Sequence, residues 1–410
     1  MKRREATQLL LASAVASRAS LASAAPSVSA SLPDVAVVGA GSFGAWTAHA
    51  LRRQGHRVTL IDAYGPGNSR ATSGDESRII RMSYGSKGVY TGWAKESLLE
   101  WQRLSERSRQ PVFENTGALA IGARGGEYLL SSEKFMRQEG IRFEWLDHAE
   151  IARRYPQFGL APEEIGLYEP DSGALRARRG IQLLVAELQA SGTAYRNERI
   201  RPPAPGAGRL DAIVTESGEK ISAGAYVFAC GPWLARLFPD LLGGALRTPR
   251  AEVYYFGSAA GDPQFKAGHF PAWFDVASPS MDAYGVPDLD ERGMKIGTDA
   301  YDEPTDPDAQ ERTPTPKYLE ATRAYMKKRF PRFAGAPVLE ARVCQYENTP
   351  TENYLLDRHP RIDNLWLAGG GSGHGFKNGP AVGRYVADLL RGEQANPLFT
   401  FAALNAPAKA

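Results

Sequence analysis

The sequence has few of the residues that bind metals or build disulfide frameworks. It contains two cysteines, Cys230 and Cys344, and six histidines in 410 residues. Two cysteines exclude a disulfide framework and a four-cysteine zinc site, although one bridge in an oxidising compartment stays open. The histidines show neither HxxxH nor HEXXH spacing, so we expect no metal site.

Long apolar runs are also missing. No window of about 18 uncharged apolar residues occurs after the N-terminal segment, so we expect no membrane span. Charged residues make up 23% of the chain and hydrophobic residues 43%, as in ordinary globular proteins. A chain of 410 residues exceeds one simple core, which favours two domains.

The first 24 residues have the order of an export signal. A basic start precedes an apolar run over 9–16, and small residues follow it. The Arg3–Arg4 pair indicates the twin-arginine route, although residues 5–7 are less hydrophobic than is usual there. We therefore expect a periplasmic or secreted protein, or a cytoplasmic one if residues 1–24 are only a disordered tail.

The net charge of the chain is +3. Residues 1–24 contain four basic residues and one glutamate, and so have the same net charge. The remainder is near neutral, and we expect no nucleic-acid partner.

A complete βαβ unit is predicted after the N-terminal segment. A short apolar strand begins at Asp34, a helix follows over 45–54, and a second strand covers 57–62. Further helices are predicted over 89–104, 181–190, 318–330 and 381–390, and strands over 118–121, 225–229 and 365–368. The segment 302–316 is rich in Pro, Asp and Thr, which predicts a surface loop.

The turn between the first strand and the helix has the sequence GAGSFG. Its first glycine permits the tight turn, its second lets backbone approach a pyrophosphate, and its third allows close helix packing. The helix N-terminus directs N–H groups at the phosphates, and Asp62 can accept hydrogen bonds from ribose hydroxyls. The pattern predicts that the chain binds NAD or FAD and does not decide between the two. The residues of the turn expected to contact the cofactor are Gly39, Gly41, Ser42, Phe43 and Gly44.

A series of longer motifs follows this unit. In chain order these are SGDESRIIRMSYG (73–85), TGALAIG (116–122), EPDSGAL (169–175), FACGPW (228–233), GMKIG (293–297), CQYENTPTENYLLDRHP (344–360) and SGHGFKNGPAVG (372–383). Together they resemble the monomeric sarcosine oxidase group of the D-amino-acid-oxidase superfamily, whose GD-x-RIIR-x-x-YG element is present here with one extra residue. The resemblance implies FAD as the cofactor, and a small amine or amino acid and O₂ as the substrates.

The resemblance also implies a fold and a domain arrangement. The fold would be α/β, with an FAD-binding Rossmann-type (glutathione-reductase-like) domain interleaved with a mixed-sheet substrate domain. The FAD domain would take residues 33–115, 165–240 and 345–395, and the substrate domain 116–164 and 241–344. Residues 396–410 would form a loose tail, and a monomer is expected.

Cys344 begins an element, CQYENTP, that is similar to the Cys-x-Tyr-x-x-Thr-Pro element of the group. In that group the cysteine bonds covalently to the flavin ring methyl. The resemblance therefore implies covalent FAD at Cys344, and a nearby positive field should lower the pKa of the thiol. Otherwise a free cysteine is usually a small buried hydrophobe. Cys230 is expected to pack beside the cofactor.

Several residues match the group's substrate positions. Arg81 and Lys377 match the pair that holds the substrate carboxylate, which two cations suit well; a surface salt bridge is the alternative for each. Lys295 matches the oxygen-activating lysine, and Tyr284 a pocket tyrosine. Asp299 replaces a histidine of the group, which indicates an altered pocket.

The remaining expected cofactor contacts lie in the first and last of these motifs. They are Arg78, Gly373, His374, Gly375, Phe376 and Lys377. We expect His374 to contact the flavin and not to act as a base.

The expected activity is the oxidation of a secondary amino acid, N-methyl or cyclic, to the imine, with O₂ reduced to H₂O₂. One alternative is an exported flavin amine dehydrogenase that passes electrons to a quinone or carrier protein. Another is a tailoring flavoenzyme that acts on a larger amine. A nicotinamide-dependent dehydrogenase shares only the GAGSFG motif.

Overall fold

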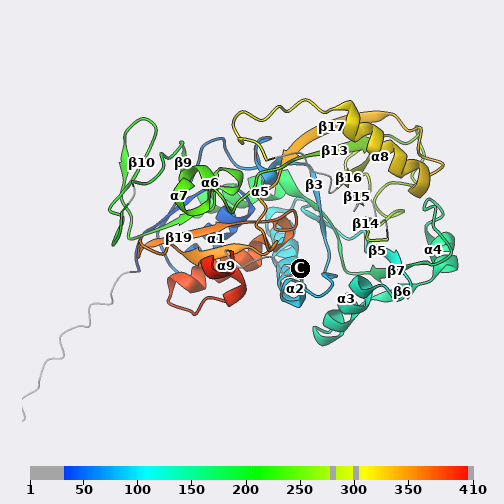
Figure 1. The fold of residues 1–410 in the computed structure, drawn as a ribbon, viewed down its shortest axis with the longest axis horizontal. Helices are drawn as coiled ribbons and strands as arrows, with labels where there is room; N and C mark the ends of the chain where they lie inside the picture. The colour runs from blue at the N-terminus through cyan, green and yellow to red at the C-terminus, as the bar shows by residue number, and fades with distance from the viewer. Residues whose placement is uncertain (1–31, 205, 278–282, 299–303, 405–410) are drawn as a thin grey trace, which may run out of the picture. The chain divides into compact units, whose positions relative to one another are not determined.

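The computed structural model describes residues 32–204, 206–277, 283–298 and 304–404. The predicted export signal and Asp299 lie outside the described residues. Residues 33–410 form one unit, and its described part contains sheets of six, eight, three and two strands (Figure 1).

The predicted βαβ unit lies within the six-stranded sheet. β1 (Val35–Val38) pairs in parallel with β2 (Val58–Asp62) and with β12 (Ala225–Phe228). Val37 and Val38 point to opposite faces, and each packs in a different hydrophobic cluster. Because both faces are buried, the strand is apolar throughout. The sheet is completed by β9 (Ala194–Asn197), β19 (Leu365–Gly369) and β18 (Leu355–Arg358).

Helices cover one face of this sheet, and a smaller cluster covers the other. The first face packs against α1 (Ser42–Arg53), α2 (Gly88–Ser108), α5 (Ala177–Ala190) and α9 (Gly379–Leu390). The second face packs against α6 (Leu234–Leu237), α7 (Pro239–Leu242) and the hairpin of β10 (Ile213–Val214) and β11 (Lys220–Ile221). No described helix is long and apolar enough to cross a lipid bilayer.

The eight-stranded sheet is mixed. Its strand pairs are antiparallel except the pair of β14 (Ala272–Asp275) with β5 (Ala118–Ala123). The helix α8 (Pro316–Arg329) covers one face, where Met326 packs in one cluster with Trp273 and Met294. In order, the strands are β17 (Val338–Gln345), β13 (Arg250–Phe256), β16 (Met294–Thr298), β15 (Ala283–Val286), β14 (Ala272–Asp275), β5 (Ala118–Ala123), β7 (Glu164–Glu169) and β6 (Glu144–Leu146). The accompanying helices are α3 (Glu127–Gln138), α4 (His148–Arg154) and α8 (Pro316–Arg329).

A three-stranded antiparallel sheet contributes cations to the site. It consists of β3 (Ser77–Ile80), β8 (Gly173–Arg176) and β4 (Phe113–Glu114). β3 contacts β15 of the large sheet and the short turn Phe376–Asn378. This position brings Arg78 and Arg81 between segments that are distant in sequence.

The predicted α/β class with a mixed second sheet is confirmed. The domain boundaries remain a prediction. The strand β7 spans the predicted boundary at residue 165 and pairs with β5 and β6, so all of it belongs to the eight-stranded sheet.

The prediction of a loose C-terminal tail is wrong for residues 397–404. Pro397–Phe399 forms a 3-10 turn and Phe401–Leu404 forms α10. Phe399 is fully buried, and its ring centroid lies 4.8 Å from that of Trp93. Leu404 is also buried, in the cluster on the other face of the six-stranded sheet, so two apolar side chains hold a segment whose own sequence shows no periodic pattern.

Candidate active site

The GAGSFG turn has the close contacts that its glycines predict. Gly39 has φ +105°, and a Cβ there would lie 2.2 Å from the carbonyl oxygen of Ala229. A Cβ on Gly44 would lie 1.8 Å from the carbonyl oxygen of Gly39. Neither position admits a side chain without a backbone shift, so α1 begins directly behind β1.

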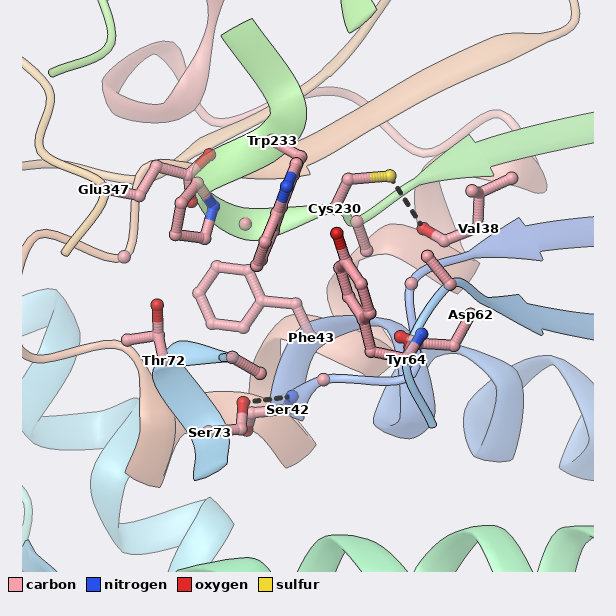
Figure 2. Close-up of a pocket in the computed structure, with 18 of the residues that line it drawn as sticks. Val38, Ser42, Phe43, Asp62, Tyr64, Thr72, Ser73, Cys230, Trp233 and Glu347 are labelled. Carbon is pink, nitrogen blue, oxygen red and sulfur yellow. Dashed lines mark hydrogen bonds between the residues drawn. The ribbon is translucent and has the colours of Figure 1, made fainter. Parts of the chain in front are cut away.

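A cavity of about 300 Å³, here called the first cavity, lies in front of this turn. Figure 2 shows Asp62 and Tyr64 on one side of it and Glu347 on the other, with Phe43 between them. The predicted contacts that line it are Gly39, Gly41, Ser42, Phe43, Asp62, Arg78, Gly373, Gly375 and Phe376. Cys230 also lines it, as expected.

Asp62 is held at the end of β2 by backbone groups. Its carboxylate accepts N–H bonds from Ala40 at 2.7 Å, Tyr64 at 2.8 Å and Gly65 at 2.9 Å. Burial raises the pKa of Asp62 despite these three bonds. The carboxylate is thereby fixed in orientation, with lone pairs remaining for a hydroxyl ligand.

These residues fit a dinucleotide. The first turn of α1 contains no acidic residue, so its N-terminal N–H groups favour an anion. Asp62 offers acceptors to a ribose, and the pocket wall is largely apolar around Phe43 and Trp233. In the described part of the chain no cluster of His, Cys, Asp and Glu suits a metal ion.

A second cavity, of about 540 Å³, adjoins the first. The residues that line both are Arg78, Tyr346, Ser372, Gly373 and Phe376. Four of the predicted site residues line only the second cavity: Arg81, Tyr284, His374 and Lys377. His374 and Lys377, expected to contact the cofactor, therefore face the second cavity. A ligand there would lie next to one end of a ligand in the first.

Two cations, the buried Lys377 and the half-buried Arg81, face the second cavity without a carboxylate partner in the described residues. Lys377 donates from Nζ to the hydroxyl of Tyr84 at 2.8 Å and to the carbonyl of His374 at 3.1 Å. Arg81 donates to the hydroxyl of Tyr128 at 3.1 Å and lies 4.0 Å from the ring centroid of Phe274. Burial, with the neighbouring charge of Arg81, lowers the pKa of Lys377 well below its ordinary value.

A third cation, Lys295, is part of a buried charge network. Its Nζ pairs with the carboxylate of Asp75 and donates to the carbonyl of Ser77 at 2.8 Å. Arg78 donates to the same carboxylate, and Tyr255 donates to it at 2.7 Å. Although burial opposes it, the charges of Lys295 and Arg78 hold the pKa of Asp75 below its ordinary value.

Tyr284 and His374 are fixed by their surroundings. Nζ of Lys295 lies 5.5 Å from the centroid of the Tyr284 ring. Both ring nitrogens of His374 are occupied: one pairs with the hydroxyl of Tyr354 at 2.9 Å and the other with the carbonyl of Glu352 at 3.0 Å. Burial lowers the pKa of His374 well below its ordinary value, which favours the neutral ring.

Cys344 lies on β17 and lines neither cavity. Sequence reasoning expected a positive field to lower the pKa of its thiol, and the structure shows the opposite direction. Burial and the carboxylate of Asp75 raise the pKa of Cys344 more than the three nearby cations lower it. The cations are Arg78, Lys295 and Arg342.

Sequence reasoning missed several residues of the site. Asp75 lies inside the first long motif, yet only its pairing with Lys295, 220 residues away in sequence, makes it part of the site. Tyr84 and Tyr128 support the two unpaired cations. Glu347 is a buried acid in the first cavity. Buried polar residues within a matched motif are the signal that could have found Asp75 and Glu347.

Comparisons with known proteins agree with this geometry. The family model described as "FAD dependent oxidoreductase" matches residues 34–389. Monomeric sarcosine oxidase of Streptomyces avermitilis is 29% identical over 385 residues, which cover 90% of this chain and 96% of the relative. N-methyl-L-tryptophan oxidase of Salmonella arizonae is 26% identical over 360 residues, which cover 87% of this chain and 94% of the relative. The crystal structure of L-proline dehydrogenase from P. horikoshii matches the fold with a TM-score of 0.80 at 19% identity, covering 92% of this chain and 99% of that one.

The family model spans both large sheets and every element that lines the two cavities up to α9. The same stretch contains the tight glycine turn, the carboxylate at the end of β2 and the cavity in front of them. With the family match and this fit to a dinucleotide, the chain belongs to the family of FAD dependent oxidoreductases.

Proposed function

We propose that this protein oxidises a secondary amino acid, N-methyl or cyclic, to the imine and transfers the electrons through FAD to O₂, forming H₂O₂. The observation that supports this most is the pair of cations, the half-buried Arg81 and the buried Lys377, which have no carboxylate partner in the described residues and line the cavity that adjoins the cofactor cavity. A buried cation without an anionic partner is costly. A carboxylate ligand would compensate both.

The chain's own residues would bind and orient the substrate. Arg81 and Lys377 would hold the carboxylate, Arg81 with a planar fork of donors. Anchoring at the carboxylate restricts the α-carbon to one position relative to the shared wall between the cavities. The bound FAD would supply the acceptor for the hydride equivalent of the C–H bond beside the amine and the route of the electrons to O₂.

The pocket also affects the amine. Arg78, Arg81 and Lys377 line the second cavity together with tyrosine hydroxyls. Of the acids that line it, Asp275 pairs with Arg329, Glu352 pairs with Lys87, and Glu127 is exposed. The cations would favour loss of the proton from a bound ammonium group. The neutral amine has the lone pair needed to form the imine. The side chains of Tyr84, Phe274 and Tyr284 supply aromatic walls around it.

Lys295 is proposed as the group that assists O₂. Its charge is buried and held by Asp75, so it needs no reorganisation when negative charge develops nearby. Retention of this lysine supports the oxidase over the dehydrogenase alternative.

We further propose that FAD is linked to Cys344. The sulfur would bond to the ring methyl carbon, and the two protons and two electrons lost from the S–H and C–H bonds would go to O₂. The three cations near Cys344 support thiolate formation, while burial opposes it. Acid precipitation tests the link: flavin colour stays with the wild-type protein and is released from Cys344→Ser.

Export by the twin-arginine route is also a proposal, supported by the order of residues 1–24. Fractionation of cells that express the full chain, with Arg3 and Arg4 intact or both replaced by Lys, tests it. Retention of the substituted chain inside the cell agrees with the proposal; export of both chains contradicts it.

The activity is tested by anaerobic mixing of the purified yellow protein with secondary and primary amino acids, followed by air. Bleaching by secondary amino acids, with colour and peroxide returning in air, is the expected result. Bleaching without recovery in air would favour the dehydrogenase alternative. If no amino acid bleaches a fully loaded flavin, the carboxylate-binding role of Arg81 and Lys377 is wrong.

A further inference from the structure

Glu347 is a buried acid that the proposed reaction does not use. It follows β17, is 6% exposed and lines the first cavity. Its Oε1 atom has no hydrogen-bond partner among the described residues. In the Cys-x-Tyr-x-x-Thr-Pro element its position is unspecified, so the motif gives no reason for an acid there.

The carboxyl group of Glu347 lies beside the glycines at the end of β19. Its Oε1 would lie 2.6 Å from a Cβ added to Gly369, so the carboxyl group fills the space beside that glycine. The nearby N–H groups of Gly370 and Gly371 favour the charged carboxylate. Burial outweighs these donors and raises the pKa of Glu347 to about 8. A neutral carboxyl at pH 7 has an O–H to donate.

The position of Glu347 in the first cavity indicates which half of the cofactor would lie next to it. Figure 2 shows it on the side opposite Asp62 and Tyr64. Asp62 ends the strand after the glycine turn, where an adenosine ribose is bound in dinucleotide folds. The other end of FAD, its riboflavin half, would therefore lie toward Glu347 and toward the residues that line both cavities.

We propose that Glu347 is a cofactor-binding residue whose carboxyl group hydrogen-bonds the riboflavin half of FAD. A buried carboxyl oxygen without a hydrogen-bond partner, in a residue that lines the cofactor cavity, is costly unless a ligand satisfies it, and FAD is the ligand that this family binds. In the protonated form the carboxyl donates to a carbonyl or ring nitrogen, or to a ribityl oxygen. The inference rests on FAD binding and not on the substrate, so its failure leaves the amino acid proposal unaffected.

FAD affinity of the apoprotein tests the proposal. The measurement uses the Cys344→Ser chain, in which FAD binds only reversibly, with Glu347 intact or changed to Gln or Ala. We expect Glu347→Ala to raise the Kd at pH 7 by about tenfold, which is the loss of one hydrogen bond to a buried group. Glu347→Gln, which keeps a donor, should raise it less. Glu340→Gln is the matched control, because Glu340 lies on β17 and lines neither cavity.

The pH dependence is a second readout. The affinity of the parent should fall above about pH 8, because the carboxyl loses the proton that it donates; that of Glu347→Gln should not. Circular dichroism of each apoprotein checks folding, and if the Ala variant is unfolded the Gln profile decides. An unchanged Kd in a folded Glu347→Ala chain, or the same pH dependence in Glu347→Gln, would overturn the proposal.

The absorption spectrum of the wild-type holoenzyme separates the two parts of the riboflavin half. A shift of the flavin bands between pH 6 and pH 10 that is absent in Glu347→Gln assigns the bond to the ring. A changed Kd with unchanged bands assigns it to the ribityl chain.

Discussion

Lys377 donates from Nζ to the hydroxyl of Tyr84 at 2.8 Å, and the guanidinium carbon of Arg81 lies 4.8 Å from the centroid of the same ring. One phenol thus contacts the two cations of the second cavity that have no carboxylate partner among the described residues. Asn378 also donates to this hydroxyl, at 3.0 Å. These contacts hold both cations on the wall that would bind a carboxylate.

Replacing Lys377 with Met should weaken substrate binding. A charged hydrogen bond to the carboxylate is lost, which amounts to about 1.5–3 kcal/mol, or roughly 10- to 150-fold in kcat/KM. Steady-state kinetics with the best secondary amino acid measures it. Lys95→Met, a half-exposed position on α2, is the control, and equal effects of the two substitutions would contradict the assignment.

The KM should rise with pH. Lys377 binds a carboxylate only when protonated, and burial, together with Arg81, lowers its pKa well below the ordinary lysine value. As pH rises through that lowered pKa, the charge is lost and the substrate binds more weakly. The kcat should rise over the same range if C–H cleavage needs the neutral amine. In Lys377→Met the rise of KM should disappear, and its persistence would place the titrating group elsewhere.

Lys295→Met should slow the return of flavin colour in air by about 10²- to 10³-fold, because a preorganised charge near the electron acceptor is lost. Stopped-flow oxidation of the bleached enzyme measures this step apart from substrate binding. Lys328→Met, which is exposed on α8, serves as the control. If Lys295→Met oxidises at the wild-type rate, the lysine has only a structural role.

Asp75→Asn should destabilise the fold by about 3–5 kcal/mol, because it leaves Lys295 and Arg78 buried without their carboxylate. Urea unfolding of the apoprotein measures the change. Asp34→Asn removes an exposed pair with Arg57 and should leave the free energy of unfolding nearly unchanged. Similar losses in both variants would show that burial does not determine the contribution of these pairs.

Gly44→Ala should abolish FAD loading. The added Cβ would lie 1.8 Å from a backbone oxygen, so α1 must move away from the turn that faces the phosphates. Such overpacking costs about 1–3 kcal/mol in addition to the lost cofactor. Gly335→Ala meets no atom within 4 Å and is the matched control. The flavin-to-protein absorbance ratio is the readout, and a yellow Gly44→Ala protein would contradict the expectation.

The sequence by itself determined the elements whose reasons are local. β1 is apolar at every position because both of its faces are buried, and that pattern is visible in the sequence. Gly44 is required by a contact within the turn and Gly39 takes a positive φ there, so their spacing between two apolar strands predicts the dinucleotide fold. The family motifs then predicted FAD and the mixed second sheet.

Only the tertiary structure decided the electrostatic environment of the site. Asp75 and Lys295 are 220 residues apart in the chain, and nothing local in either segment indicates their pairing. The direction of the Cys344 pKa shift came out opposite to the sequence expectation, because it depends on how burial and four charged neighbours balance. Periodicity and spacing report which residues are buried and how the backbone turns, whereas a charge interacts with whatever atoms the fold packs around it.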